Sequence, residues 1–304
     1  MMIYKKIKIY AELVEMKAKL ASLLPFLLGV LYSIYNMHQV RIADSIILIV
    51  AMLLFNMSVD MLDNYCDYKN ASLEHDYRDK TNIIGREDLS LKGILTAIII
   101  FISISAILGL YLVNKTGYML LILGIYSFCV GIFYSAGPIP ISSLPLGEFF
   151  SGTTMGFVII LITVGVNIGG FSNLNYAELA DIFVFSVPSI FAISALMLTN
   201  NLCDIVEDRI NGRKTLACVI GQENSIKLLY IFYGICLFGV IVNVILRLAP
   251  ITYLIVLAAT GKIFKNVKKI EDLPIKEKSF RFAVANLGMI LVFQFAGFFI
   301  GLFL

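Results

Sequence analysis

The chain has 304 residues and a formal net charge of +3, and 59% of its residues are hydrophobic. Its mean hydropathy of +0.89 excludes an ordinary soluble domain and is typical of a polytopic membrane protein. The small positive charge does not indicate nucleic-acid binding. Five scattered cysteines and only two histidines argue against a disulfide framework and against a zinc or haem site. We therefore expect an all-α fold, because only helices and closed barrels satisfy their backbone groups in lipid.

Nine apolar runs are candidate membrane spans, and a span needs about 20 residues. In chain order they are Ser22–Asn36, Ala43–Leu62, Leu95–Val113, Tyr118–Tyr134, Phe149–Val166, Ile182–Leu202, Leu228–Leu246, Pro250–Phe264 and Phe282–Leu304. The first and the eighth are short. A polar, charged stretch separates the basic start of the chain from the first run, so we expect no cleavable signal peptide.

The distribution of basic residues indicates the orientation of these spans. With nine spans and a cytosolic N-terminus, 21 of the 24 Lys and Arg residues fall on inside segments, and only Arg41, Lys115 and Arg247 fall outside. Cytosolic segments carry an excess of basic residues in membrane proteins. We therefore predict a multi-pass protein of the cell membrane with its N-terminus inside and its C-terminus outside.

Two acidic patterns lie where the second and the sixth apolar runs end. Their polar residues are three or four positions apart, and residues so spaced share one helix face. They are Asn56, Asp60, Asp63 and Asp67 in the first pattern and Asn200, Asp204 and Asp208 in the second. A carboxylate at bilayer depth costs about 2.5–3.5 kcal/mol, so such groups normally serve a site. The alternative to a functional site is a helix end that emerges into water, where the aspartates are merely solvated. This alternative fits Asp67 better than the residues deeper in the apolar run.

Carboxylate pairs of this kind suit magnesium, because Mg²⁺ takes one or two carboxylates together with phosphate oxygens. We expect the two patterns to open into one chamber on the cytosolic side and to bind a diphosphate. Each pattern is a span followed by an acidic stripe and a basic loop. This arrangement predicts one domain over residues 1–304 with two pseudo-repeated halves, about 1–140 and 141–304.

Basic and aromatic residues accompany the two patterns. Gly212 can end a helix through a left-handed conformation, which would turn Arg213 and Lys214 toward the chamber, where cations stabilise a leaving phosphate. Alternatively, both cations serve only to set the orientation of the chain in the membrane. Tyr65 and Tyr134 flank the polar region, where an aromatic ring would stabilise a carbocation, unless they are interfacial tyrosines. We expect the lysines of residues 262–278 to lie far from the aspartates and to contact lipid headgroups.

These residues resemble those of the UbiA superfamily of intramembrane prenyltransferases. Asp63-x-x-x-Asp67 and Asp204-x-x-x-Asp208 match the two acidic motifs of the family. The Gly-Pro-Ile-Pro segment after Tyr134, with Glu148 beyond it, is similar to that of 1,4-dihydroxy-2-naphthoate prenyltransferases. The first motif of the family reads Asn-Asp where this chain reads Asp63-Asn64, which leaves both as candidates for metal contact. A third acidic residue of that motif would fall near Ala71 or Ser72, with Glu74, Asp76 or Asp79 as substitutes.

The resemblance implies nine helices around a central, cytosol-facing cavity. Two Mg²⁺ ions held by Asp63, Asp67, Asp204 and Asp208 would bind a polyprenyl diphosphate, and Lys214 would neutralise the departing diphosphate. The remaining substrate-binding candidates are Asn56, Asp60, Asn64, Tyr65, Tyr134, Glu148, Asn200, Asn201, Arg209 and Arg213. Transfer of the prenyl group to the naphthoate with loss of CO₂ would give demethylmenaquinone.

Two other functions remain as alternatives. A related prenyltransferase would use another acceptor, such as 4-hydroxybenzoate or a lipid alcohol. A cation-coupled transporter would also need intramembrane aspartates, but Asp44, at the outer end of the second run, is the sole acidic residue of the sequence in the external half of a run. The glycine-rich Asp-Gly pattern of CDP-alcohol phosphotransferases is absent from the sequence. The sequence does not indicate the prenyl chain length or the oligomeric state.

Overall fold

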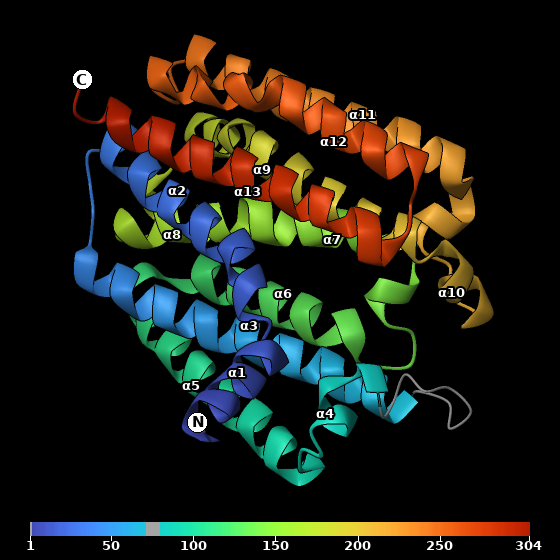
Figure 1. Ribbon diagram of the computed structural model, residues 1–304. Coiled ribbons are helices and arrows are strands. Elements are labelled where there is room, and N and C mark those ends of the chain that lie inside the picture. The colour runs from blue at the N-terminus through green and yellow to red at the C-terminus, as the bar shows by residue number, and fades with distance from the viewer. Residues whose placement is uncertain (1, 71–79) are drawn as a thin grey trace. The chain divides into compact units, whose positions relative to one another are not determined.

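The computed structural model describes residues 2–70 and 80–304, and all of its regular elements in these ranges are helices (Figure 1). The prediction of an all-α fold is therefore confirmed for the described part of the chain. The chain forms two compact units. Unit 1 comprises Met1–Lys19 and Ile46–Pro140, and unit 2 comprises Leu20–Ser45 and Ile141–Leu304.

Unit 1 is built on the long helix α3 (Ile42–Asn70), whose first turn belongs to unit 2. Its other elements are α1 (Met2–Leu13), η1 (Met16–Lys19), α4 (Ile83–Arg86), α5 (Leu91–Thr116) and α6 (Tyr118–Ser135). The Ser105 hydroxyl of α5 donates a hydrogen bond of 2.8 Å to the carbonyl oxygen of Ala51 in α3. Phe55 of α3 stacks on Phe128 of α6 with ring centroids 4.1 Å apart. These contacts join α3 to both apolar helices that follow it.

Unit 2 contains the remaining helices. They are α2 (Leu20–Asn36), η3 (Ile141–Ser143), α7 (Gly147–Thr153), η4 (Thr154–Val158), α8 (Ile159–Asn167), η5 (Phe171–Asn173), α9 (Tyr176–Cys203), α10 (Ile205–Ile210), α11 (Leu216–Ile245), η6 (Ile251–Ala259), α12 (Thr260–Asp272) and α13 (Lys276–Gly301). α9 lies at the centre of this unit and contacts α7, α8, α11 and α13 (Figure 1). Four buried aromatic side chains from α2, α9, η6 and α13 pack together in its core, namely Tyr32, Phe185, Tyr253 and Phe298.

Seven helical segments among the described residues are long and apolar enough to cross a membrane. They are α3, α5, α6, the continuous stretch Gly147–Asn167, α9, α11 and α13. The first predicted run forms α2, which has only 17 residues. The eighth forms η6 and the start of α12. The chain is therefore a multi-pass membrane protein, whereas nine spans and the predicted orientation stay predictions.

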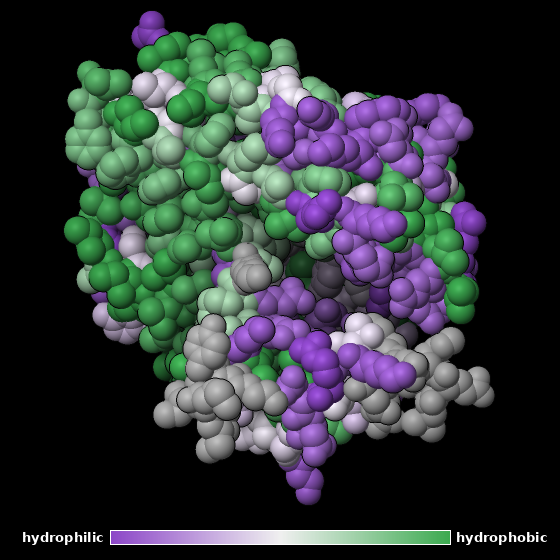
Figure 2. All heavy atoms as spheres, in the orientation of Figure 1, coloured by the Kyte–Doolittle hydropathy of each residue, from purple (hydrophilic) through white to green (hydrophobic). Residues whose placement is uncertain are grey.

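Hydrophilic side chains gather over one end of the helices of unit 2. Figure 2 shows them over α12 and the start of α13, whereas hydrophobic side chains cover α13 toward the C-terminus. Within α12, the buried residues Ile263, Val267 and Ile270 occupy one face, and exposed lysines occupy the other. The aspartates of the second pattern lie close to this hydrophilic end, because Asp204 follows the last residue of α9 and contacts Lys276 at the start of α13.

Small residues allow α7 and η4 to approach α9 closely. A Cβ atom on Gly156 would lie 2.6 Å from the Cα atom of Ile190, a distance at which something must shift. Membrane helices commonly use small residues in this way, because their association depends on packing.

We predict that Gly156→Ala destabilises the protein by about 1–3 kcal/mol, because overpacking displaces a backbone in contact. The measurement is the thermal unfolding temperature in one detergent. Gly234→Ala is the matched control, since a Cβ atom there meets nothing within 4 Å. Equal unfolding temperatures for the two variants would contradict this account of the contact.

Candidate active site

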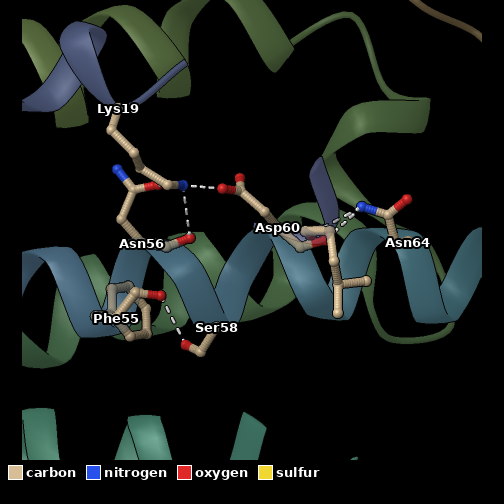
Figure 3. Close-up of polar contacts among 7 residues, drawn as sticks. Lys19, Phe55, Asn56, Ser58, Asp60 and Asn64 are labelled. Atoms are coloured by element: carbon tan, nitrogen blue, oxygen red, sulfur yellow. Dashed lines mark hydrogen bonds and ion pairs between the residues drawn. The ribbon is translucent and has the colours of Figure 1, made fainter. Parts of the chain in front are cut away.

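The first acidic pattern begins with a buried cation. The Lys19 side chain is in η1, and its ammonium forms an ion pair with Asp60 and donates a hydrogen bond of 2.6 Å to Asn56 Oδ1 (Figure 3). Lys19 is only 5% exposed. Burial lowers the pKa of Lys19 to about 8, against the raising effect of Glu15, so the side chain stays mostly protonated at neutral pH. Asn56 and Asp60 are thus held together by one lysine.

In the next turn of α3, the neighbouring side chains of Asp63 and Asn64 make different kinds of hydrogen bond. The Ser135 hydroxyl at the end of α6 donates a hydrogen bond of 2.5 Å to Asp63 Oδ1. The Asn64 amide instead donates to the carbonyl oxygens of Asp60 at 3.1 Å and Leu13 at 3.4 Å. An amide nitrogen engaged with backbone oxygens serves the fold, whereas a half-buried carboxylate oriented by a hydroxyl suits a cation. This geometry favours Asp63 over Asn64 as a metal ligand.

The two tyrosines of unit 1 differ in their surroundings. Tyr65 packs against the hydrophobic cluster around Leu13 and Met61, and the Lys69 ammonium lies 5.1 Å from its ring centroid. Its ring therefore already contacts a cation of the protein, which weakens the assignment to a carbocation. Tyr134 is half-buried near the end of α6.

Asp67 is also half-buried. The candidate substitutes for the third acidic residue of the first motif, Glu74, Asp76 and Asp79, lie outside the described residues.

The second pattern spans two consecutive helices rather than one. α9 ends at Cys203, and Asp204, with φ −101° and ψ 8°, separates it from α10. The Asp204 side chain does not cap α10 and instead contacts Lys276. The Asp204 N–H still donates to Asn200 O at 3.1 Å, and the Asp208 N–H donates to Asp204 O at 2.8 Å. These bonds preserve the helical spacing across the break.

Asp208 is 3% exposed and is held by two donors. The Thr215 hydroxyl donates to its Oδ2 atom at 3.1 Å, and the Arg213 guanidinium lies 3.6 Å from its Oδ1 atom. Burial raises the pKa of the Asp208 carboxyl, and Asp204 raises it further, whereas Thr215 and Arg213 lower it. The carboxylate therefore depends on these two donors for its charge.

The predicted helix end at Gly212 is present and positions Arg213. Gly212 has a φ of +69°, and the Arg213 N–H donates to the carbonyl oxygen of Asp208 at 2.8 Å. This pattern is the usual glycine-terminated helix end. The Lys214 side chain is exposed, and its backbone N–H donates to Ser143 O at 2.9 Å. Arg209 is exposed on α10.

One lysine of the basic segment contacts an aspartate, contrary to the prediction for residues 262–278. The Lys276 ammonium at the start of α13 forms an ion pair with Asp204 Oδ2. The connection between α12 and α13 returns the chain to the end of α9, an effect of tertiary structure. Lys276 and Lys278 have similar neighbours in the sequence, so no local signal distinguishes the residue that reaches the site.

Glu148 and Asn201 form a buried polar pair beside the second pattern. Asn201 in α9 donates a hydrogen bond of 2.9 Å to Glu148 Oε1 in the first turn of α7. Ser194 donates to the backbone carbonyl oxygen of Glu148, also at 2.9 Å. The Glu148 side chain is 3% exposed, and its Oε2 atom has no hydrogen-bond partner among the described residues. The pair joins the first turn of α7 to the last turn of α9, just before Asp204.

The donor sets suit magnesium. Each acidic pattern offers carboxylate oxygens, which Mg²⁺ prefers, and the ion needs only one or two of them when a phosphate supplies the rest. No group of three or more His, Cys, Asp or Glu residues that could hold a metal is found in the described part of the chain. A closed protein cage is therefore not indicated within residues 2–70 and 80–304, and a pair of carboxylates that shares the ion with a substrate is the arrangement that fits.

The site and the fold define a class of membrane protein, and comparison with known families identifies it. Residues 22–299 match the UbiA prenyltransferase family, and the chain belongs to this family. Over 248 residues it is 27% identical to the 1,4-dihydroxy-2-naphthoate octaprenyltransferase of Bacillus subtilis (strain 168), spanning 82% of this chain and 77% of that protein. Over 181 residues it is 30% identical to UbiA prenyltransferase domain-containing protein 1 of Dictyostelium discoideum, spanning 57% of this chain and 52% of that protein.

Solved structures show the same fold at low sequence identity. The apo structure of a UbiA homolog from Aeropyrum pernix K1 has a TM-score of 0.73 and 17% identity, covering 95% of this chain and 98% of that one. A UbiA homolog from Archaeoglobus fulgidus bound to DMAPP and Mg²⁺ has a TM-score of 0.60 and 16% identity, covering 97% and 99% of the two chains. The predicted resemblance to prenyltransferases is thus confirmed.

The ion pair between Lys19 and Asp60 should contribute to the stability of the protein. Lys19→Met should destabilise the protein by about 3–5 kcal/mol, because it leaves Asp60 half-buried without its cation. Adding Asp60→Leu should recover part of this loss, since the double variant removes the uncompensated charge. Thermal unfolding in detergent measures both effects, with Lys8→Met, an exposed lysine of α1, as the control. A double variant less stable than Lys19→Met would show that the ion pair is not the cause.

Proposed function

We propose that this prenyltransferase transfers a polyprenyl group from polyprenyl diphosphate to 1,4-dihydroxy-2-naphthoate in a Mg²⁺-dependent reaction. The products are the quinol form of demethylmenaquinone, diphosphate and CO₂, and oxidation of the quinol to the quinone is a separate step. The observation that carries the acceptor is the similarity, over 82% of the chain, to a protein named 1,4-dihydroxy-2-naphthoate octaprenyltransferase. The Gly-Pro-Ile-Pro segment before Glu148 supports the same acceptor.

The carboxylates of both acidic patterns would hold the metal ions. Asp63 and Asp67 would form one pair of ligands, and Asp204 and Asp208 would form the other. When bound, Mg²⁺ supplies Lewis-acid chemistry that draws charge from the leaving group. The Ser135 hydroxyl orients Asp63, and the Thr215 hydroxyl orients Asp208. A relative of known structure that binds DMAPP together with Mg²⁺ supports this assignment.

The chain's own cations would act on the leaving diphosphate. Arg213 already lies beside Asp208, and Lys214 follows it in the same turn. Fixed positive charge at the point where negative charge develops lowers the barrier to ionisation. The allylic carbon–oxygen bond breaks with its electron pair going to diphosphate. The ring carbon that bears the carboxylate then attacks the allylic carbon, and the carboxylate leaves as CO₂, whose bonding electrons restore the aromatic ring. Apolar spans around the prenyl chain exclude water, which would otherwise quench the cation.

The membrane arrangement is part of the proposal. Nine spans with the N-terminus inside would place both acidic patterns on the cytoplasmic side of the cell membrane. Supporting observations are the seven long apolar helices and the coincidence of the two shortest predicted runs with α2 and with η6–α12. The distribution of 21 of 24 basic residues supports the orientation.

We predict that Asp208→Asn and Asp67→Asn each lower prenyl transfer by about 100-fold or more, because each removes a carboxylate that holds charge at the leaving group. Asp88→Asn is the control, since it makes the same change at an exposed position whose left-handed backbone asparagine tolerates. The assay incubates purified membranes with Mg²⁺, a polyprenyl diphosphate and dihydroxynaphthoate, and mass spectrometry identifies the product.

Two further arms test the metal and the acceptor. Removing divalent ions with a chelator should abolish turnover, and adding Mg²⁺ back should restore it. Replacing dihydroxynaphthoate by 4-hydroxybenzoate should give no prenylated product. Full turnover in either aspartate variant would refute the metal assignment, and a product with 4-hydroxybenzoate alone would refute the acceptor.

A further inference from the structure

Lys276 reaches the second acidic pattern from a part of the chain that the motifs do not include. Its ammonium contacts Asp204 across 72 positions of sequence. Asp204 is the residue at which α9 ends, and its side chain is 15% exposed, whereas that of Lys276 is 48% exposed. The lysine head therefore lies at the accessible side of a half-buried carboxylate.

The backbone around Lys276 is held independently of this ion pair. Between α12 and α13 the Ile275 N–H donates to Leu273 O at 2.8 Å, and the Ser279 N–H donates to Ile275 O at 2.8 Å. The buried Ser279 hydroxyl also donates to Leu273 O. Pro274 restricts the connection further. These contacts determine where α13 begins, so the turn does not need Lys276 in order to form.

The ion pair itself contributes little to stability. Half-exposed pairs are screened by water and lose side-chain entropy when they form. A lysine carries a compact charge on a flexible stem, so its ammonium can move between neighbouring acceptors without a backbone change. Asp204 already takes part in the proposed metal site. A ligand oxygen bound beside Asp204 would therefore also lie within reach of the Lys276 ammonium.

Charge balance in this half of the site calls for further cations. Asp204 and Asp208 together balance one Mg²⁺, and the phosphate groups of the substrate then add negative charge that grows as the bond to the prenyl group breaks. Arg213 contacts Asp208, and Lys276 contacts Asp204. The two cations therefore lie on different members of the aspartate pair, which suits a ligand with two phosphate groups.

We propose that Lys276 is a diphosphate-binding residue, whose ammonium donates a hydrogen bond to a phosphate oxygen of the prenyl diphosphate held at Asp204 and Asp208. The assignment rests on the proposed function and adds a residue outside both acidic motifs. Lysine is a common phosphate ligand and acts there as a point charge. The lysine binds the leaving group and makes no covalent bond.

The test measures binding of Mg²⁺ with inorganic diphosphate to the full-length protein in detergent. Lys276→Met should weaken the apparent affinity by about 10- to 100-fold, because it removes one hydrogen bond between charged groups. Lys276→Arg should keep most of the affinity, since it retains a positive donor. Lys278→Met is the matched control, as this exposed lysine lies two residues further along the same helix.

Four outcomes are informative. Weaker diphosphate binding in Lys276→Met, with an unchanged unfolding temperature without ligand, supports the proposal. Unchanged binding with a lower unfolding temperature would show a merely structural ion pair and overturn it. Equal weakening in Lys276→Met and Lys278→Met would indicate a diffuse basic surface and also overturn it. If the unaltered protein does not bind magnesium diphosphate, the proposed function itself fails and this inference fails with it.

Turnover provides a second readout that does not depend on inorganic diphosphate. With geranyl diphosphate as the donor, Lys276→Met should raise KM for the donor by about 10-fold or more and leave KM for the acceptor unchanged. A rise in the acceptor KM of the same size would contradict contact with the leaving group.

Discussion

A charged side chain in an apolar helical protein needs a partner, because an uncompensated charge away from water is expensive. Four aspartates of the two acidic patterns follow this constraint. Asp60 is paired with Lys19, Asp63 with the Ser135 hydroxyl, and Asp204 with Lys276. Asp208 has Arg213 and Thr215. These partners come from elements distant in the sequence as well as from adjacent turns, so the tertiary fold assembles the charges on which the proposed chemistry depends.

The same constraint separates residues that serve the fold from residues that suit a ligand. Asn64 uses its amide to tie α3 to the end of α1, and Tyr65 packs on the core of unit 1. Asp63 and Asp208, in contrast, are oriented by hydroxyl groups, which leave carboxylate lone pairs for a cation. Glu148 is intermediate, since Asn201 binds one of its oxygens while the other has no partner among the described residues.

Much of this arrangement was predictable from the sequence, because hydropathy and helical spacing are local signals. All nine apolar runs coincide with helices, and the glycine that ends α10 has the expected left-handed conformation. The break at Asp204 was not foreseen, since spacing alone cannot distinguish a continuous helix from two helices in register. The contact of Lys276 was missed for a different reason: the turn between α12 and α13 determines it, and nothing in the neighbouring residues marks one lysine among several.

The composition of unit 2 has a consequence for biosynthesis. Helix α2 lies near the start of the chain, yet it packs against α8 and α13, which the ribosome makes much later. Unit 1, apart from its first 19 residues, is one uninterrupted stretch that ends at Pro140. The chain therefore completes unit 1 while α2 is still without α8 and α13. Pairing between segments so far apart in the sequence is slow, so we expect α2 to join its final neighbours late in assembly.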